Sequence, residues 1–152
     1  MSDTRPSIDQ VRMLAFQERG DERGRLVIAE GGQDIPFEIK RVFYIYDSVP
    51  DVVRGRHANR ISEFVLINMA GSSRVRVTDG ARERDYVLDR PHTGIYIPRM
   101  IWKEMYAFSE HAVLLVLSSE HYDAAEYLRD YDEYLEEVKR YGEAVDHHPG
   151  LL

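Results

Sequence analysis

Residues 64–80 read FVLINMAGSSRVRVTDG, and this stretch decides the fold of the chain. Its first part, Phe64–Met69, is apolar at nearly every position, which is typical of a strand covered on both faces. Its second part, Ser73–Thr78, alternates strictly, with valines on one face and arginines on the other, as in a half-exposed strand. Asp79-Gly80 then predicts a tight hairpin turn, because glycine accepts the positive φ that such turns require. The stretch therefore predicts successive strands joined by short turns.

The same pattern continues on both sides of this stretch, from Val11 to Ser119. Short segments rich in Val, Ile, Tyr and Phe recur about every ten residues, a spacing that predicts an all-β sandwich or barrel. Because Val113–Leu117 is also apolar throughout, we expect a helix, a second sheet or a partner subunit to cover the outer faces of the two apolar strands. The predicted strands are Val11–Phe16, Arg25–Glu30, Glu38–Tyr46, Phe64–Met69, Ser73–Thr78, Asp85–Leu88, Gly94–Ile97, Lys103–Phe108 and Ala112–Ser118.

After Ser119 the apolar positions recur at three and four residues, which predicts an amphipathic helix. We expect its aromatic stripe to pack on the barrel, and Gly142 to end the helix. The positions with this spacing are Tyr127, Leu128, Tyr131, Tyr134, Leu135, Val138 and Tyr141. The chain then divides into a flexible N-terminus at 1–9, a barrel at 10–119, a helical segment at 120–142 and a disordered tail at 143–152.

The chain has 152 residues, of which 43% are hydrophobic, and a formal net charge of −7. This length fits one domain, and the negative balance argues against a nucleic-acid partner. The excess of acids lies after residue 119, where the chain contains ten acids and three bases, so the predicted barrel is electrically balanced. The sequence has no cysteine, no apolar run that could span a membrane and no secretory signal, so we expect a cytoplasmic protein without a membrane partner.

The segment 54–63, RGRHANRISE, is the strongest candidate for a functional site. It is dense in arginine, and in a regular strand His57, Asn59 and Glu63 would point to the same face. An imidazole titrates near neutrality and can act as a general base. In a small barrel, polar side chains on inward faces and at the mouth are where a ligand would bind.

Two patterns resemble the metal-binding motifs of cupins, namely Gly55-x-His57-x-Asn59-x-x-x-Glu63 followed by Gly71, and Pro98-x-x-x-x-Lys103. The chain is more closely similar to the cupin sugar 3,4-ketoisomerases, the WxcM-like enzymes that act on dTDP-4-keto-6-deoxyglucose. The motifs that carry this resemblance are Arg23-Gly24, Ile35–Ile45, Arg54-Gly55-x-His57-Ala58, Gly71-Ser72-x-Arg74-Val75, Ile101-Trp102-x-Glu104-Met105, and Tyr122-Asp123 through Tyr131-Asp132.

The resemblance implies an all-β cupin, a double-stranded β-helix or jelly-roll barrel, followed by a C-terminal α-helix. It also implies a homodimer that exchanges N-terminal strands, binds a dTDP-linked 4-keto-6-deoxy sugar and uses no metal or other cofactor. The family's reaction moves the carbonyl of the hexose from C4 to C3 through an enediol. The product serves deoxy-amino-sugar synthesis for surface polysaccharides such as lipopolysaccharide O-antigen.

Two positions depart from the family pattern, which has His-x-His at 57 and 59 and usually a histidine after the tryptophan. This chain has Asn59 and Lys103 there. We expect His57 to be the base, while Asn59 donates a hydrogen bond to an enolate oxygen or holds the imidazole in one tautomer. Lys103 could stabilise an enediolate or pair with Glu63, which is also a substrate-binding candidate. Since only His57 and Glu63 remain of the four cupin ligand positions, we do not expect a bound metal.

Other side chains are expected at the same site from the resemblance and from strand parity. Arg41 and Arg54 are expected on the diphosphate, and Arg74 is a further substrate-binding candidate. Tyr44 and Tyr46 share a strand face, so they either pack the barrel or offer phenols to the sugar, with Tyr44 as a catalytic group and Tyr46 as a substrate contact. If the departures prevent isomerisation, the alternatives are an epimerase-like enzyme or a sugar-nucleotide-binding module without catalysis.

Overall fold

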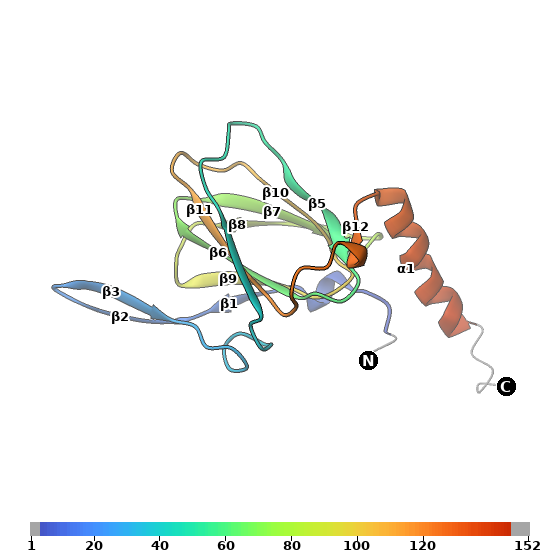
Figure 1. The fold of residues 1–152 in the computed structure, drawn as a ribbon, viewed down its shortest axis with the longest axis horizontal. Helices are drawn as coiled ribbons and strands as arrows, with labels where there is room; N and C mark the ends of the chain where they lie inside the picture. The colour runs from blue at the N-terminus through green and yellow to red at the C-terminus, as the bar shows by residue number, and fades with distance from the viewer. Residues whose placement is uncertain (1–3, 147–152) are drawn as a thin grey trace.

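Two five-stranded antiparallel sheets face each other in the computed structural model, which describes residues 4–146 (Figure 1). In spatial order, the first sheet contains β1 (Arg12–Ala15), β9 (Thr93–Ile97), β6 (Phe64–Ala70), β11 (Val113–Ser118) and β4 (Arg41–Ile45). The second sheet contains β12 (Tyr127–Leu128), β5 (Arg54–Asn59), β10 (Trp102–Tyr106), β7 (Ser73–Thr78) and β8 (Glu83–Leu88). The predicted all-β cupin barrel is therefore confirmed.

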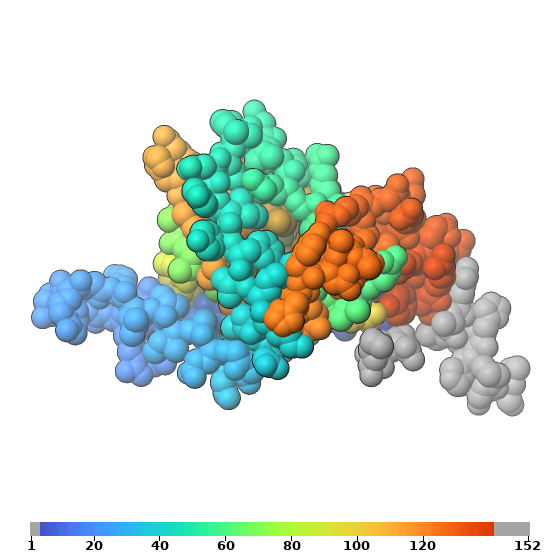
Figure 2. Space-filling view, viewed as in Figure 1, coloured from blue at the N-terminus to red at the C-terminus, as the bar shows by residue number. Residues whose placement is uncertain are grey.

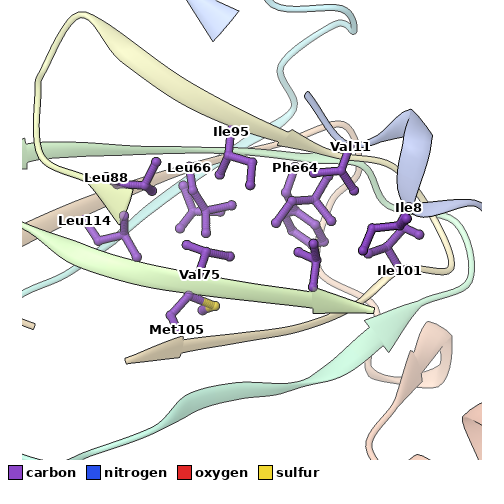
Figure 3. Close-up of a cluster of buried hydrophobic side chains, with 13 residues drawn as sticks. Ile8, Val11, Phe64, Leu66, Val75, Leu88, Ile95, Ile101, Met105 and Leu114 are labelled. Atoms are coloured by element: carbon purple, nitrogen blue, oxygen red, sulfur yellow. The ribbon is translucent and has the colours of Figure 1, made fainter. Parts of the chain in front are cut away.

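The main core lies between the two sheets (Figure 3). From the first sheet, β6 contributes Phe64 and Leu66, and from the second, β7 contributes Val75 and Val77, all at most 2% exposed. The two valines alternate with arginines, so one face of β7 meets the core and the other meets solvent. Full burial of an aliphatic side chain of this size contributes about 1.5–3 kcal/mol.

A second apolar cluster covers the outer face of the first sheet. Val65 of β6 and Leu117 of β11 pack there in one cluster with Ile35 and Phe37. The connection between β3 and β4 therefore covers strands that are apolar on both faces. We had expected a helix, a second sheet or a partner subunit in this position.

The hairpin of β2 (Gln17–Asp21) and β3 (Gly24–Ile28) forms a separate two-stranded sheet. It projects from the barrel as an arm, on the side opposite to the C-terminal helix (Figures 1 and 2). Leu26 in this arm is 59% exposed. A two-stranded hairpin is only marginally stable by itself in water, so packing against another surface would stabilise an arm of this kind.

The segment after Ser119 reaches the helix later than predicted. Residues Ala124–Glu126 form a 3₁₀ turn, β12 pairs with β5, and α1 then runs from Tyr131 to Asp146. The predicted helical position of Tyr127 and Leu128 was wrong, because their apolar side chains serve a strand. The helix also continues past Gly142 into the predicted tail, of which residues 147–152 lie outside the described residues.

Tyr134 anchors α1 on the barrel, as expected for the aromatic stripe. Its side chain is fully buried, and its ring lies 5.6 Å from that of Trp102, measured between centroids. Its hydroxyl lies 2.9 Å from the carbonyl oxygen of Met100 and 3.1 Å from that of Thr78. Within residues 4–146, no helix is long and apolar enough to cross a membrane.

The N-terminal segment is held on the barrel from residue 4 onward. The prediction of a flexible stretch at 1–9 was therefore wrong for residues 4–9, and residues 1–3 lie outside the described residues. Ile8–Gln10 form a 3₁₀ helix, and the side chain of Ile8 is fully buried in the main core. The backbone N–H of Ile8 donates to the Asp79 carboxylate at 2.8 Å. Asp9 in turn accepts one hydrogen bond from Arg82 and one from Arg84. One apolar anchor and these polar contacts therefore fix the segment.

Candidate active site

A cavity of about 270 Å³ opens among residues of β4, β5, β10 and the segment around β12. The polar side chains of its lining are Arg54, His57, Lys103, Tyr127 and Arg129. Its apolar lining comes mainly from inward side chains of both sheets, namely Phe43, Ile45, Phe64, Leu66, Met105 and Val116. A few charged groups in a mainly apolar hollow are typical of a small-molecule site.

Strand β5 carries the site because its first residues depart from regular strand geometry. Gly55 has a φ of 84° and Arg56 a φ of 55°. A β-carbon at Gly55 would lie 2.9 Å from the carbonyl oxygen of Lys103, so glycine allows β5 to approach β10 closely. His57 is the direct register partner of Lys103, next to a register shift between the two strands. The imidazole and the amine are thereby brought to one cavity.

His57 is half-buried, and its ring faces that of Tyr127 edge-on with 4.9 Å between centroids. Its Nδ1 is buried and has no hydrogen-bond partner among the described residues. Burial, together with the positive charges of Lys103 and Arg129, lowers the pKa of His57 to about 3, and the side chain of Asn59 opposes this shift only in part. The imidazole is therefore neutral at physiological pH, which is the form that can accept a proton.

Lys103 is buried, with 3% exposure. Its Nζ donates a hydrogen bond to Oδ1 of Asn59 at 3.1 Å and lies 4.5 Å from the centre of the Phe64 ring. Burial lowers the pKa of Lys103 to about 7, opposed by the carboxylate of Glu126 and reinforced by Arg41. Near neutral pH the amine therefore exists in both protonated and neutral forms and is able to exchange protons with a ligand.

Asn59 is fully buried and joins Lys103 to Glu126. Its Nδ2 donates to Oε1 of Glu126 at 2.7 Å. Glu126 also accepts the backbone N–H groups of Ile61 and Ser62, each at 2.8 Å, and the hydroxyl of Ser62. Burial raises the pKa of Glu126, but these hydrogen bonds outweigh it and hold the pKa below its usual range. The carboxylate therefore stays ionised at neutral pH.

Arginines from three parts of the chain gather at this cavity. Arg54 and Arg129 line it, whereas Arg41 of β4 is not among the lining side chains but lies close enough for its charge to lower the pKa of His57. The guanidinium of Arg41 donates to the hydroxyls of Tyr127 at 3.2 Å and Ser118 at 3.3 Å. Its Nε is buried without a hydrogen-bond partner among residues 4–146. Guanidinium groups in this arrangement suit an anionic ligand such as a diphosphate.

Tyr44 and Tyr46 lie away from this cavity, which corrects their expected place in it. They are 62% and 59% exposed on the outer face of the first sheet. Phe43 and Ile45 occupy the inward positions of β4 and pack against the main core. Because neighbouring residues of a strand point to opposite faces, the two tyrosines point outward in this chain.

Arg74 and Glu63 also lie elsewhere. Arg74 is on the solvent face of β7, where its Nε pairs with Asp85 at 3.1 Å. The chain leaves β5 before Glu63, so this residue does not keep the expected strand parity. Its carboxylate accepts a hydrogen bond from Tyr96, and the expected ion pair with Lys103 is replaced by the bond from Lys103 to an amide.

Three residues of the site were not predicted as such: Glu126, Tyr127 and Arg129. They lie in a segment whose spacing fits a helix and whose acids would then face water. Asp123 is the signal that could have shown that these residues do not belong to the helix. Its carboxylate accepts the N–H of Ala125 and so begins a short turn before the strand.

The donor set of the cavity does not suit a metal ion. Among the described residues, no group of three or more His, Asp or Glu side chains lies close enough to hold one. Of the cupin ligand positions, His57 lies in the cavity, whereas Asn59 is bonded on both sides and Lys103 would repel a divalent cation when protonated.

The fold and this cavity define a cupin barrel whose cavity is lined by a neutral histidine, a buried lysine and two arginines. The chain belongs to the family described as FdtA, WxcM-like, C-terminal, whose model matches residues 9–139. It is similar to the TDP-4-oxo-6-deoxy-alpha-D-glucose-3,4-oxoisomerase of Aneurinibacillus thermoaerophilus, with 41% identity over 123 residues, 81% of this chain and 88% of that protein.

Solved structures of sugar ketoisomerases have the same fold. A 3,4-ketoisomerase from Helicobacter canadensis is 45% identical with a TM-score of 0.83, over 86% of this chain and 98% of that chain. A mutant of the 3,4-ketoisomerase QdtA from Thermoanaerobacterium thermosaccharolyticum, in complex with TDP-4-keto-6-deoxyglucose, is 40% identical with a TM-score of 0.85, over 88% and 97% of the two chains. The family resemblance drawn from the sequence motifs is therefore confirmed.

Proposed function

We propose that this protein is an isomerase that converts a dTDP-linked 4-keto-6-deoxyhexose into its 3-keto isomer. The proton on C3 passes to a base, leaving an enediolate across C3 and C4. The hydroxyl proton then moves from the C3 oxygen to the C4 oxygen, and a proton adds to C4. The hydrogen lost at C3 is balanced by the one gained at C4, so no oxidant or reductant is consumed. Relatives at 40–45% identity that carry the name 3,4-ketoisomerase support this assignment.

His57 is the base in this proposal. It is neutral at physiological pH, and its buried Nδ1 has no hydrogen-bond partner among the described residues. A pKa of about 3 makes the imidazole a weak base in the free protein. The charges of Lys103 and Arg129 contribute to that low pKa, so an anionic diphosphate beside them raises it and strengthens the base when substrate binds.

Lys103 is the electrophilic partner of the base. Its buried amine supplies positive charge to the enediolate and, with a pKa of about 7, a proton for the returning step. Asn59 acts on Lys103 rather than on the sugar, because it does not line the cavity, its Nδ2 donates to Glu126 and its Oδ1 accepts from the amine. Arg54 and Arg129 bind the diphosphate at the cavity.

The observation that carries this proposal is the register pair of His57 and Lys103, which places a neutral imidazole and a proton-exchanging amine in one cavity. The test follows TDP-4-keto-6-deoxyglucose by NMR with the unmodified protein and with His57→Asn. We expect the 3-keto product, formed about 100-fold more slowly by the variant. TDP affinity, measured by calorimetry, should change by no more than about twofold. Equal rates in the two proteins would place the base elsewhere.

We also propose a homodimer that exchanges its N-terminal strands. The projecting β2–β3 hairpin with its exposed Leu26 supports this, as do the exposed Val42, Tyr44 and Tyr46 on the outer face of the first sheet. Burial of these apolar side chains by a second copy would stabilise the arm. Light scattering should give the mass of a dimer, and Leu26→Asp should shift it toward the monomer; a monomeric unmodified protein would contradict the proposal.

We place this activity in the cytoplasm, as a step of deoxy-amino-sugar synthesis for surface polysaccharides such as lipopolysaccharide O-antigen. The chemistry supports this order of reactions, because a ketone at C3 is the substrate that an amino-transfer reaction needs to install nitrogen at that carbon.

A further inference from the structure

Glu126 is a buried acid that the reaction described above does not use. It is 5% exposed, and it is not one of the side chains that line the cavity. We propose that Glu126 is a positioning residue for the isomerisation, which acts through the amide of Asn59 to hold the Lys103 amine beside His57. The catalytic meaning of this inference rests on the proposed function, whereas the arrangement of the side chains can be tested separately.

The Glu126 carboxylate is itself fixed on both oxygens. Oε2 accepts the backbone N–H groups of Ile61 and Ser62, and Oε1 accepts the Ser62 hydroxyl and Nδ2 of Asn59. An ionised carboxylate accepts hydrogen bonds and donates none, so all of its partners here are donors. The turn that follows β5 therefore holds a negative charge in a constant position next to Asn59.

This carboxylate decides which end of Asn59 faces Lys103. A side-chain amide can turn over and exchange its oxygen and nitrogen with little change in shape. Here one neighbour only accepts and the other, when protonated, only donates, so a single orientation satisfies both. Nδ2 lies 2.7 Å from Glu126 and Oδ1 lies 3.1 Å from Nζ of Lys103. The opposite orientation would set oxygen against carboxylate and NH₂ against ammonium, which is unfavourable in a buried site.

The negative charge of Glu126 also favours the protonated form of Lys103, as the orientation of the Asn59 amide does. It raises the pKa of Lys103, whereas burial, the largest effect, and Arg41 lower it. The other titratable side chains at the cavity are His57, Arg54, Arg129 and Tyr127, and none of them is a carboxylate. Glu126 is therefore the negative group that favours the protonated amine, and its loss lowers the pH at which Lys103 gives up its proton.

The arrangement also joins the two positions at which the chain departs from the ketoisomerase pattern. Asn59 and Lys103 stand where the pattern has histidines, and they are hydrogen-bonded to each other. With Glu126 they form one buried unit, which spans β5, β10 and the turn before β12. Asn59 and Glu126 therefore hold Lys103 in place at a position where the family pattern has a histidine.

The test is the titration of Lys103 by NMR in protein carrying ¹³C,¹⁵N-labelled lysine. The chain has three lysines, Lys40, Lys103 and Lys139, so Lys103→Met assigns the signal. In Glu126→Gln we expect the pKa of Lys103 to fall by about one unit or more. We also expect kcat to fall about tenfold, with KM within about twofold, and the alkaline limb of the pH profile to move to lower pH.

Glu137→Gln is the matched control. It removes another carboxylate of the C-terminal segment, which pairs with Arg60 at 2.6 Å. Because this carboxylate is not one of the charges that shift the pKa of Lys103, both that pKa and kcat should stay unchanged. A folded Glu126→Gln protein in which the Lys103 titration and kcat match the unmodified protein would overturn the inference, even if its Tm were lower. That outcome would give Glu126 a structural role alone.

A second measurement needs no variant and applies even if Glu126→Gln fails to fold. In the unmodified protein, the ¹³Cγ signal of Asn59 should titrate together with Lys103, because Oδ1 accepts from the amine. A ¹³Cγ shift that is constant across this titration would overturn the inference. If both signals behave as expected but the unmodified protein forms no 3-keto product, the proposed function fails and the arrangement stands.

Discussion

Replacing Lys103 by methionine removes a buried amine and keeps a flexible side chain of similar length. In the folded protein, burial lowers the pKa of Lys103 to about 7 from an ordinary value of 10.5. At 1.36 kcal/mol for each unit, this difference of about 3.5 units corresponds to roughly 5 kcal/mol as an upper bound. Between pH 7 and pH 10.5 the lysine at position 103 binds more protons in the unfolded chain than in the folded chain. The lysine therefore makes the folded state more stable as the pH rises through this window, and below it the destabilisation is constant.

The quantity to measure is the difference in unfolding free energy between the unmodified protein and Lys103→Met. Urea titrations at pH 6, 7, 8 and 9, at one protein concentration, give this difference, in which the other titrating groups largely cancel. From pH 7 to pH 9 we expect it to move in favour of the unmodified protein by roughly 2–3 kcal/mol. Lys139→Met, which removes an exposed amine on α1, controls for the loss of one charge. A difference for Lys103→Met that does not depend on pH would refute the reasoning.

Three further predictions concern the cavity. Arg129→Ala should weaken TDP binding about tenfold in calorimetry, because its guanidinium lines the cavity, whereas Arg74→Ala on the solvent face of β7 should leave binding unchanged; equal effects would contradict the assignment. The kcat/KM profile should fall above about pH 7 as Lys103 loses its proton, and this limb should be absent in Lys103→Arg; a flat profile in the unmodified protein would argue against Lys103 as the acid. Gly55→Ala should lower the unfolding free energy by about 1–3 kcal/mol, since a β-carbon would meet the carbonyl oxygen of Lys103 at a positive φ, and an unchanged thermal melt would show that the strands can separate.

The strands could be predicted because their patterns record burial directly. Strand β7 alternates since one face meets the core, and β6 is apolar throughout since both faces are covered. The cover on the outer face could not be predicted, because it comes from a connecting segment with Ile35 and Phe37, and a connection has no period. Strand β5 was missed for a different reason, since its sequence RGRHAN contains one small apolar residue, Ala58, and no β-branched residue that would indicate a strand.

The site was predicted in part, and the errors have local causes. Parity shows that Tyr44 and Tyr46 share a face of the predicted strand, but both faces of β4 carry large apolar side chains, so parity does not tell which face turns inward. Glu126 could not be recognised because it is one acid in an acidic segment. Its burial depends on β12 pairing with β5, a contact between residues far apart in the chain.

The most direct test of the proposed isomerisation is an incubation of the protein with TDP-4-keto-6-deoxyglucose in deuterated water, followed by NMR of the hexose. Proton transfer through His57 and Lys103 predicts loss of the C3 proton signal together with appearance of a 3-keto product, unchanged by added chelator. Tight binding of the sugar nucleotide with neither exchange at C3 nor product would contradict the account.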